Sequence, residues 1–218
     1  MKHAKHAALA SFLIFSCATG AFAQSKKPIS PFALDVHAFF PNIGQDPQTA
    51  KDLDIQPEEI PGRVFGVAIR AHFYPVRGQV RSLGVGFEAL RGRGRKELVA
   101  SGEPTGVVVG QVLEGFAGLV TLNFGHRNGW SYLVGGLGPV RVRNYVTAPD
   151  ALPTPAPAGK VALTYGGGAR WFKTDHLGFS FDVRFYDLKP IATVATVPAT
   201  PGRGRQHLLL MSAGIAIR

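Results

Sequence analysis

The stretch GFSFDVRFY, residues 178–186, places a bulky apolar side chain at every second position and a polar one between them. On one face an extended strand would carry Phe179, Phe181, Val183 and Phe185, and on the other Ser180, Asp182, Arg184 and Tyr186. A period of two residues indicates a β-strand, because successive side chains point to opposite faces. The chain also has 27 glycines and 16 prolines, which punctuate the alternating segments. These features predict an all-β protein.

The same alternation recurs in seven further segments. They cover residues 32–40, 63–74, 80–90, a part of 107–124, 130–143, 161–172 and 207–218. Most of these segments are close to the about 9–11 residues that a tilted strand needs to cross a bilayer. Eight such strands predict an eight-stranded antiparallel up-and-down transmembrane β-barrel.

The links between the predicted strands alternate in length. Short links are expected at residues 75–79, 125–129 and 173–177, and long links at residues 41–62, 92–106, 144–160 and 187–206. Outer-membrane barrels have short periplasmic turns at one rim and longer extracellular loops at the other. The alternation therefore favours this class, with both termini on the turn side.

The first 23 residues have the features of a cleaved signal peptide. A basic start is followed by an apolar run and by AFA at residues 21–23, a small-x-small cleavage site. The alternative is a lipoprotein signal in which Cys17 is lipidated. Cleavage after Ala23 would leave a short lead at residues 24–30 and a barrel domain at residues 31–218, without any cysteine.

The mature chain is basic. Loss of Lys2 and Lys5 leaves 22 basic residues against 14 acidic ones, a formal charge of +8. This excess favours anionic neighbours such as lipid phosphates, whereas export argues against nucleic acid. After residue 23 no stretch approaches the roughly 20 continuous apolar residues of a membrane helix. If the mature chain spans a membrane, it must do so as a closed barrel.

Two classes of barrel fit the alternation. A soluble, lipocalin-like barrel would point its apolar face inward around an apolar ligand, whereas a membrane barrel would point it outward to lipid. Aromatic residues near the strand ends favour the membrane class, since they are typical of membrane interfaces. The expected interface aromatics are Phe40, Tyr74, Trp130, Tyr132, Trp171 and Tyr186, with Phe124 beside them.

Several motifs resemble a known family. They are LNFGHRNGWSY at residues 122–132, GGLG at 135–138, YGGGARWF at 165–172, LG at 177–178 and DVRFY at 182–186. Together they resemble the bacterial outer-membrane protein β-barrel domain family, the small OmpA/OmpX-type barrels. The resemblance implies the fold, a location in the cell outer membrane and the barrel assembly machinery as a partner. Such barrels usually end in an outward aromatic, whereas this sequence ends Ile217-Arg218, so we expect either a weak insertion signal or a final residue that is absent from this chain.

Ionisable residues sit in the middle of several predicted strands, opposite the bulky face. The set comprises Arg70, Glu88, Arg170, Asp182 and Arg184. An eight-stranded barrel has an interior just wide enough for side chains. We therefore expect Glu88 and Asp182 to pair with some of the arginines in a structural network that plugs the lumen. The alternative, a selective pore, needs more room than eight strands give.

Basic residues gather next to two of the predicted long links. They are Arg91, Arg93, Arg95 and Lys96 after the third strand, and Arg203 and Arg205 before the eighth. Guanidinium groups suit the phosphates of lipopolysaccharide, so these residues are candidates for lipopolysaccharide contact. An ordinary solvated basic loop fits the sequence equally well.

The sequence contains little that points to catalysis or metal binding. The histidines at 37, 72, 126, 176 and 207 are scattered, and no Ser-His-Asp arrangement can be placed at one rim. There is no metal-binding spacing, and the glycines at 166–168 lie in a strand rather than before a helix, so no metal or cofactor is expected. We therefore predict a non-enzymatic, monomeric outer-membrane barrel that acts through its extracellular loops on an unknown partner. A lipid-modifying enzyme is the remaining alternative.

Overall fold

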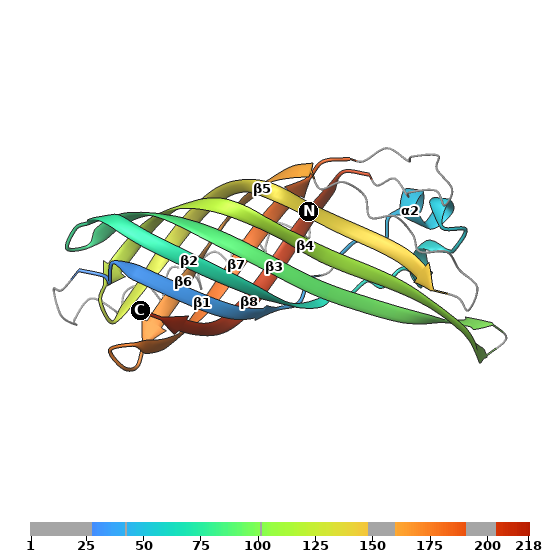
Figure 1. Ribbon diagram of the computed structural model, residues 1–218, viewed down its shortest axis with the longest axis horizontal. Helices are drawn as coiled ribbons and strands as arrows, with labels where there is room; N and C mark the ends of the chain where they lie inside the picture. Colours follow the sequence, from blue (N-terminus) through green and yellow to red (C-terminus); the bar gives the residue numbers. More distant parts are fainter. Residues whose placement is uncertain (1–27, 42, 101, 148–159, 191–203) are drawn as a thin grey trace, which may run out of the picture.

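All eight alternating segments form strands, and the strands close into one antiparallel barrel (Figure 1). The computed structural model describes residues 28–41, 43–100, 102–147, 160–190 and 204–218. The strands are β1 (Phe32–Phe39), β2 (Phe65–Arg77), β3 (Arg81–Ala100), β4 (Glu103–His126), β5 (Gly129–Thr147), β6 (Lys160–Phe172), β7 (Leu177–Leu188) and β8 (Gln206–Ile217). The predicted signal peptide lies outside the described residues.

Each strand pairs with its neighbours in sequence, and β1 closes the barrel against β8. At this seam Leu34 pairs with Ile217 and Val36 with Ile215. An up-and-down order places links alternately at the two ends of the barrel. We call the end with the links 78–80, 127–128 and 173–176 the turn end, and the opposite end the loop end.

The strand that the sequence predicts to stop at residue 74 continues to Arg77. Pro75, which was expected in the turn, lies inside β2, and the pairing with β3 shifts between Phe73 and Val76. Proline cannot donate to a strand ladder and is tolerated at such irregularities. The strand therefore passes the proline with a local shift in register.

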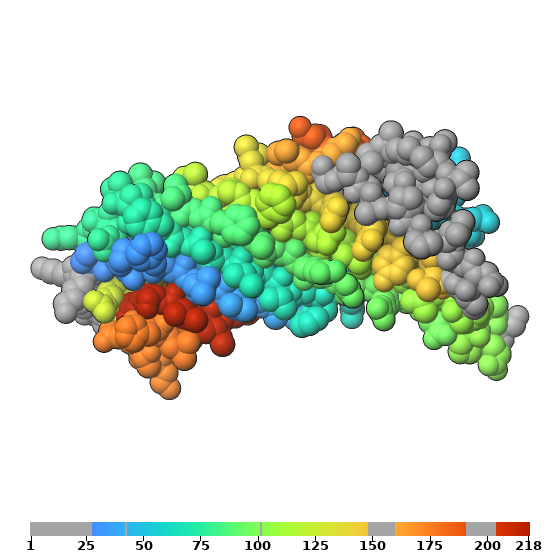
Figure 2. All heavy atoms as spheres, viewed as in Figure 1, coloured from blue at the N-terminus to red at the C-terminus, as the bar shows by residue number. Residues whose placement is uncertain are grey.

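The largest difference from the sequence prediction concerns residues 92–106. They were expected to form a loop, but they extend β3 and β4 into a long hairpin. β2 pairs with β3 only as far as Arg93, and β5 pairs with β4 only from Val108, so the tip projects past the barrel wall (Figures 1 and 2). The strict alternation of short and long links is therefore wrong at this position. Glycine alternates with arginine at residues 92–95, and no row of apolar residues continues along this segment. The sequence pattern therefore did not indicate a strand here.

The β1–β2 link folds back over the loop end. It contains the helix α2 (Pro47–Asp52) and the short 3₁₀ helix η2 (Pro57–Glu59). Asp46 caps α2, since its carboxylate accepts a hydrogen bond from the Thr49 amide at 3.0 Å. Ile43 and Ile60 are buried on either side of these helices. No helix among the described residues is long and apolar enough to cross a membrane.

The bulky face of the strands points outward. The exposed apolar residues include Phe32, Leu34, Val36, Ile69, Phe73, Val85, Phe87, Val120, Leu133, Tyr165, Phe179, Phe181, Phe185, Met211 and Ile215. The outward row of β3 runs from Arg81 through Leu83, Val85, Phe87 and Ala89 to Arg91. Ten residues at about 3.3 Å each, tilted by about 40°, give an apolar band about 25 Å tall, the height of the lipid-facing band of membrane barrels.

The interior is layered along the barrel axis. The inward row of β1 reads Ala33, Asp35, His37 and Phe39, and that of β2 reads Tyr74, His72, Arg70 and Ala68 from the same end. At the turn end an apolar layer surrounds Trp130, with Phe172 and Ile29 among its members. At the loop end a second apolar layer includes Phe39, Ile43 and Leu188. On β1 and β2 the charged residues and histidines lie between these two layers, so apolar packing flanks them at both ends.

Candidate functional site

The lumen holds balanced charge. Three arginines and three carboxylates are fully buried there among the described residues, namely Arg70, Arg170, Arg184, Asp35, Glu88 and Asp182. All five ionisable residues that the sequence placed in the lumen are found there, and Asp35 joins them. We call these six side chains the lumen network. Buried charges are tolerated only when they are paired and hydrogen-bonded, and equal numbers of both signs allow this.

Four members form the centre of the lumen network. Arg70 forms an ion pair with Glu88 through its Nε and approaches Asp182 Oδ1 with Nη2 at 3.3 Å. Arg184 approaches Glu88 Oε2 at 3.1 Å and Asp182 Oδ1 at 2.9 Å. Each arginine therefore contacts both carboxylates, and each carboxylate bridges two arginines, as the sequence predicted for Glu88 and Asp182.

Arg170 pairs with Asp35 rather than with Glu88 or Asp182. Its Nη2 lies 2.5 Å from Asp35 Oδ2, and its Nε lies 2.9 Å from Asp35 Oδ1. The two contacts form a bidentate ion pair between β6 and β1. The Arg170 guanidinium also lies 4.2 Å from the ring centroid of Tyr132, a cation–π geometry. Nη1 donates to the Tyr74 hydroxyl at 3.2 Å. This pair links two strands that do not neighbour each other in the wall.

Tyrosine hydroxyls complete the hydrogen bonding of the carboxylates. Tyr132 donates to Asp182 Oδ2 at 2.8 Å, and Tyr186 donates to Glu88 Oε1 at 2.5 Å. Gly168 leaves room for the Tyr132 ring, because a Cβ at that position would come within 2.7 Å of the tyrosine oxygen. A hydrogen bond to a charged group is stronger than one between neutral groups, so these phenols stabilise the lumen network.

The expected interface aromatics therefore divide into two groups. Phe40 and Trp171 are exposed on the outer wall, and so is Phe124. The other four, Tyr74, Trp130, Tyr132 and Tyr186, are buried in the lumen, which corrects their assignment to the membrane interface. Successive side chains of a strand point to opposite faces, and each of these four residues lies at an inward position of its strand.

One buried pair has the geometry of a nucleophile and a base. His37 Nε2 lies 2.5 Å from Ser180 Oγ, but Nδ1 faces Arg70 Nη1 at 2.6 Å and Ser212 Oγ at 2.8 Å. Arginine can only donate, so Nδ1 accepts and the proton lies on Nε2, where it is donated to Ser180. A catalytic histidine needs the opposite arrangement, with Nε2 free to accept the nucleophile's proton. All of these groups are buried in the lumen, where their hydrogen bonds link β1, β2, β7 and β8.

The candidate lipopolysaccharide contacts do not form one cluster. Arg91, Arg93 and Arg95 lie on β3 rather than in a loop and point outward. Lys96 faces the other side of the strand, where its ammonium donates to the Glu58 carbonyl at 2.5 Å. Arg205 lies near Asp187 at 3.6 Å, beside β7 and β8 on another part of the rim, and Arg203 lies outside the described residues.

Sequence reasoning missed part of the lumen. Asp35 and His37 were not among the predicted lumen residues, and their contacts with Arg170 and Ser180 were not expected. The alternation was signal enough to place them inside. Which side chains meet across the lumen depends on the tilt and closure of the barrel, which a single strand does not encode. Among the described residues no group of three or more His, Cys, Asp or Glu is placed to hold a metal.

Comparison with known proteins adds evidence on the fold. No protein-family model matches the chain, and no curated protein sequence is significantly similar to it. Among solved structures, Neisserial surface protein A is 12% identical, with a TM-score of 0.51 over 86% of this chain and 97% of that one. The attachment invasion locus protein Ail of Yersinia pestis, in complex with the heparin analogue sucrose octasulfate, is 10% identical, with a TM-score of 0.42 over 87% of this chain and 99% of that one. The outer membrane protease OmpT of Escherichia coli is 6% identical, with a TM-score of 0.45 over 88% of this chain and 99% of that one.

At these identities the likeness concerns the fold and not the activity. Neisserial surface protein A is an eight-stranded outer-membrane barrel, and the present chain also closes into a barrel of eight strands. The chain therefore has the fold of the small eight-stranded outer-membrane β-barrels.

Proposed function

We propose that this chain is an outer-membrane barrel with a sealed lumen, whose function lies in surface contacts at its loop end. The observation that carries the proposal is the distribution of polarity. Phe87 and Phe179 are at least half exposed on the outer wall, while Arg70 and Arg184 are fully buried inside. Lipid around the wall and ion pairs in the lumen satisfy both sets of residues.

The same distribution argues against a soluble barrel with an apolar ligand. Such a barrel needs an apolar cavity and a polar outer wall. Here the centre of the lumen is filled by charged groups that contact one another, and the outer wall carries a continuous apolar band. In water this band would be far larger than the apolar patches of ordinary soluble proteins.

The closed lumen also argues against transport and catalysis. An open path would have to cross the two apolar layers as well as the lumen network. The Ser180–His37 pair is buried between those layers, out of reach of a substrate. What stays accessible is the loop end, where the link that contains α2 and the β3–β4 hairpin present their surfaces (Figure 1).

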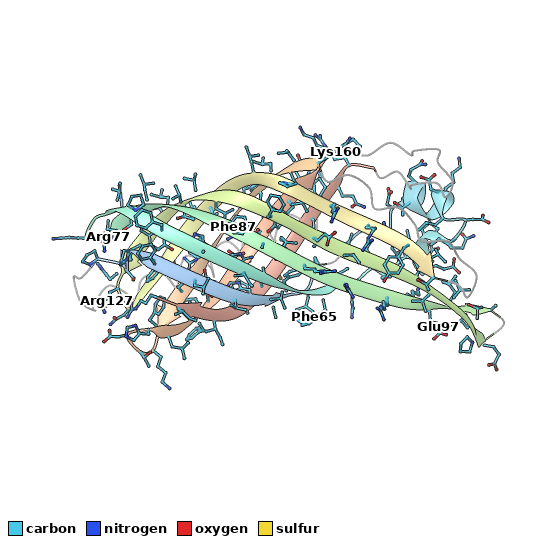
Figure 3. The ribbon with its side chains drawn as sticks, viewed as in Figure 1. Phe65, Arg77, Phe87, Glu97, Arg127 and Lys160 are labelled. Atoms are coloured by element: carbon cyan, nitrogen blue, oxygen red, sulfur yellow. The ribbon has the colours of Figure 1, made fainter. Side chains whose placement is uncertain are left out.

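Thiol labelling tests this arrangement in cells. The only cysteine, Cys17, lies in the predicted signal peptide, so an introduced cysteine would be the single thiol of the mature chain. Glu97 on the hairpin and Asn128 in a turn at the opposite end are both exposed, and Figure 3 labels Glu97 and Arg127, the neighbour of Asn128. We expect a membrane-impermeant maleimide to label Glu97→Cys on intact cells, and Asn128→Cys only after the outer membrane is permeabilised.

The unsubstituted protein is the control and should stay unlabelled. Labelling of Asn128→Cys but not Glu97→Cys on intact cells would mean that the barrel has the inverse orientation. Recovery of both variants as soluble periplasmic proteins would refute the membrane location.

A further inference from the structure

Five arginines share one outward surface on β3, β4 and β5. They occupy consecutive outward positions of the two outer strands, Arg91, Arg93 and Arg95 on β3 and Arg141 and Arg143 on β5. We call these five residues the arginine face. β4 lies between the two strands and places Glu114 beside Arg91 and Arg141, and Val112 beside Arg93 and Arg143. The register thus builds a two-dimensional basic surface that neither strand forms alone.

The charge of this surface is largely uncompensated. Glu114 is the one carboxylate that forms ion pairs with it among the described residues, 2.5 Å from Arg141 Nε and 4.0 Å from Arg91 Nε, and Glu97 occupies the next outward position of β3 after Arg95. Arg93 and Arg95 form no ion pair within the described ranges. Arg143 stacks near the Tyr145 ring at 5.9 Å, and its Nε is buried without a hydrogen-bond partner in the described part of the chain. With Glu114 and Glu97 counted against its five arginines, this surface keeps a net charge of about +3 toward an anion.

A groove opens beside this surface. It has a volume of about 450 Å³ and is bordered by Arg91, Glu114 and Arg141 on one side. Its apolar part is lined by Leu90, Gly115, Phe116 and Pro139. Phe116 is 54% exposed, so its ring offers an apolar wall to whatever enters. The groove thus joins a cationic rim to an apolar floor.

The groove lies at the level along the barrel where the outer wall changes from apolar to charged. On β3 the outward row changes from Ala89 to Arg91, and on β4 from Phe116 to Glu114. Arg91 and Glu114 are cross-strand neighbours, as are Ala89 and Phe116, so the change occurs at one level. This border lies about 25 Å from the row that begins at Arg81, which places it at the headgroups of the leaflet at the loop end.

We propose that the arginine face and its groove bind a lipopolysaccharide molecule. The phosphates of the lipid A headgroup contact the arginines, and one acyl chain lies in the groove against Phe116 and Pro139. Guanidinium groups bind phosphate oxygens through paired charge-assisted hydrogen bonds, and a lipid supplies the apolar chain that a free phosphate lacks. The inference rests on the proposed function, since only an outer-membrane location brings this lipid to the loop end.

The structure also revises which residues take part. Lys96 and Arg205, two of the candidates from the sequence, face away from this surface. Arg141 and Arg143 replace them, although they lie fifty residues along the chain from Arg91 and Arg93. Only the pairing of β4 with both β3 and β5 brings the two arginine rows together.

Lipid binding by the purified protein tests the proposal. The protein is refolded in a zwitterionic detergent, mixed with bisphosphorylated lipid A, and the lipid retained per protein is measured after gel filtration. The variant Arg93→Ser/Arg95→Ser/Arg143→Ser leaves the contacts of Glu114 intact, so the fold is kept. We expect it to bind lipid A at least about tenfold more weakly, since several charge-assisted hydrogen bonds are lost. The matched control, Arg77→Ser/Arg81→Ser/Lys173→Ser, removes the same charge at the turn end and should bind as the wild type does.

A second pair of variants tests the groove. Phe116→Ala should weaken lipid A binding, whereas Leu137→Ala, an exposed apolar position on β5 outside the groove, should not. Dephosphorylated lipid A should bind poorly to the wild type, and inorganic pyrophosphate should compete only weakly. The proposal would be overturned if the arginine variant bound lipid A as well as the wild type, or if dephosphorylated lipid A bound equally well. It would also be overturned if pyrophosphate competed fully and Phe116→Ala had no effect. This assay does not depend on orientation in cells, so it can fail separately from the labelling experiment.

Discussion

Asp35 and Arg170 form a buried ion pair across the lumen, joined at 2.5 Å between Oδ2 and Nη2 and at 2.9 Å between Oδ1 and Nε. The two residues lie on β1 and β6, which are not neighbours in the wall. Ser180 from β7 donates to the same carboxylate at 3.3 Å. The pair therefore braces two strands of the barrel that share no backbone hydrogen bonds.

Asp35→Asn should destabilise the barrel strongly. The substitution leaves the fully buried Arg170 without its counter-charge, and breaking one side of a buried pair costs about 3–5 kcal/mol. Equilibrium unfolding in urea from lipid vesicles would measure the loss. Asp187→Asn is the control, because the Asp187 side chain is 27% exposed and lies 3.6 Å from Arg205; its effect should stay within about 1 kcal/mol. Equal effects of the two variants would contradict the bracing role.

The tyrosine hydroxyls should contribute to stability only where they meet the lumen network. Tyr132→Phe and Tyr186→Phe each remove a hydrogen bond to a buried carboxylate, and each should lower the free energy of unfolding by about 1.5–3 kcal/mol. Tyr165→Phe is the matched control, since Tyr165 faces outward and stacks on Phe185. The same unfolding assay applies, and a Tyr165→Phe variant as unstable as the other two would argue against this account.

Depth in the membrane should decide the effect of a charge on the outer wall. Phe87 and Phe65 are similarly exposed, 50% and 54%, but Phe87 lies at mid-band and Phe65 pairs with Arg93 near the loop end (Figure 3). Phe87→Arg should therefore cost about 2–4 kcal/mol in vesicles, and Phe65→Arg about 0–1 kcal/mol. In a soluble barrel both positions would face water and neither substitution would destabilise much.

The sealed lumen predicts a lack of conductance. Purified protein in planar bilayers should give no stable, large single-channel steps, because the lumen network and the two apolar layers fill the cross-section of an eight-stranded barrel. An open porin reconstituted in the same way is the positive control. Reproducible large steps from the wild-type protein would show that the lumen opens.

The strand pattern made most of the wall predictable. Alternation in 178–186 assigns Phe181 and Asp182 to opposite faces, and in the structure Phe181 lies on the outside and Asp182 on the inside. The β3–β4 hairpin was not predictable in this way, because a strand that projects beyond the membrane needs no apolar face. The lumen partners were only partly predictable: the period of two gives the face of Arg170, but closure of the barrel decides that it meets Asp35.

The most direct test of the central claim is the electrophoretic mobility of the protein from carbonate-washed outer membranes, measured with and without boiling. A closed membrane barrel should stay in the washed pellet and change its mobility on boiling, because the strand ladder resists detergent until heated. Recovery as a soluble periplasmic protein whose mobility does not change would contradict the account.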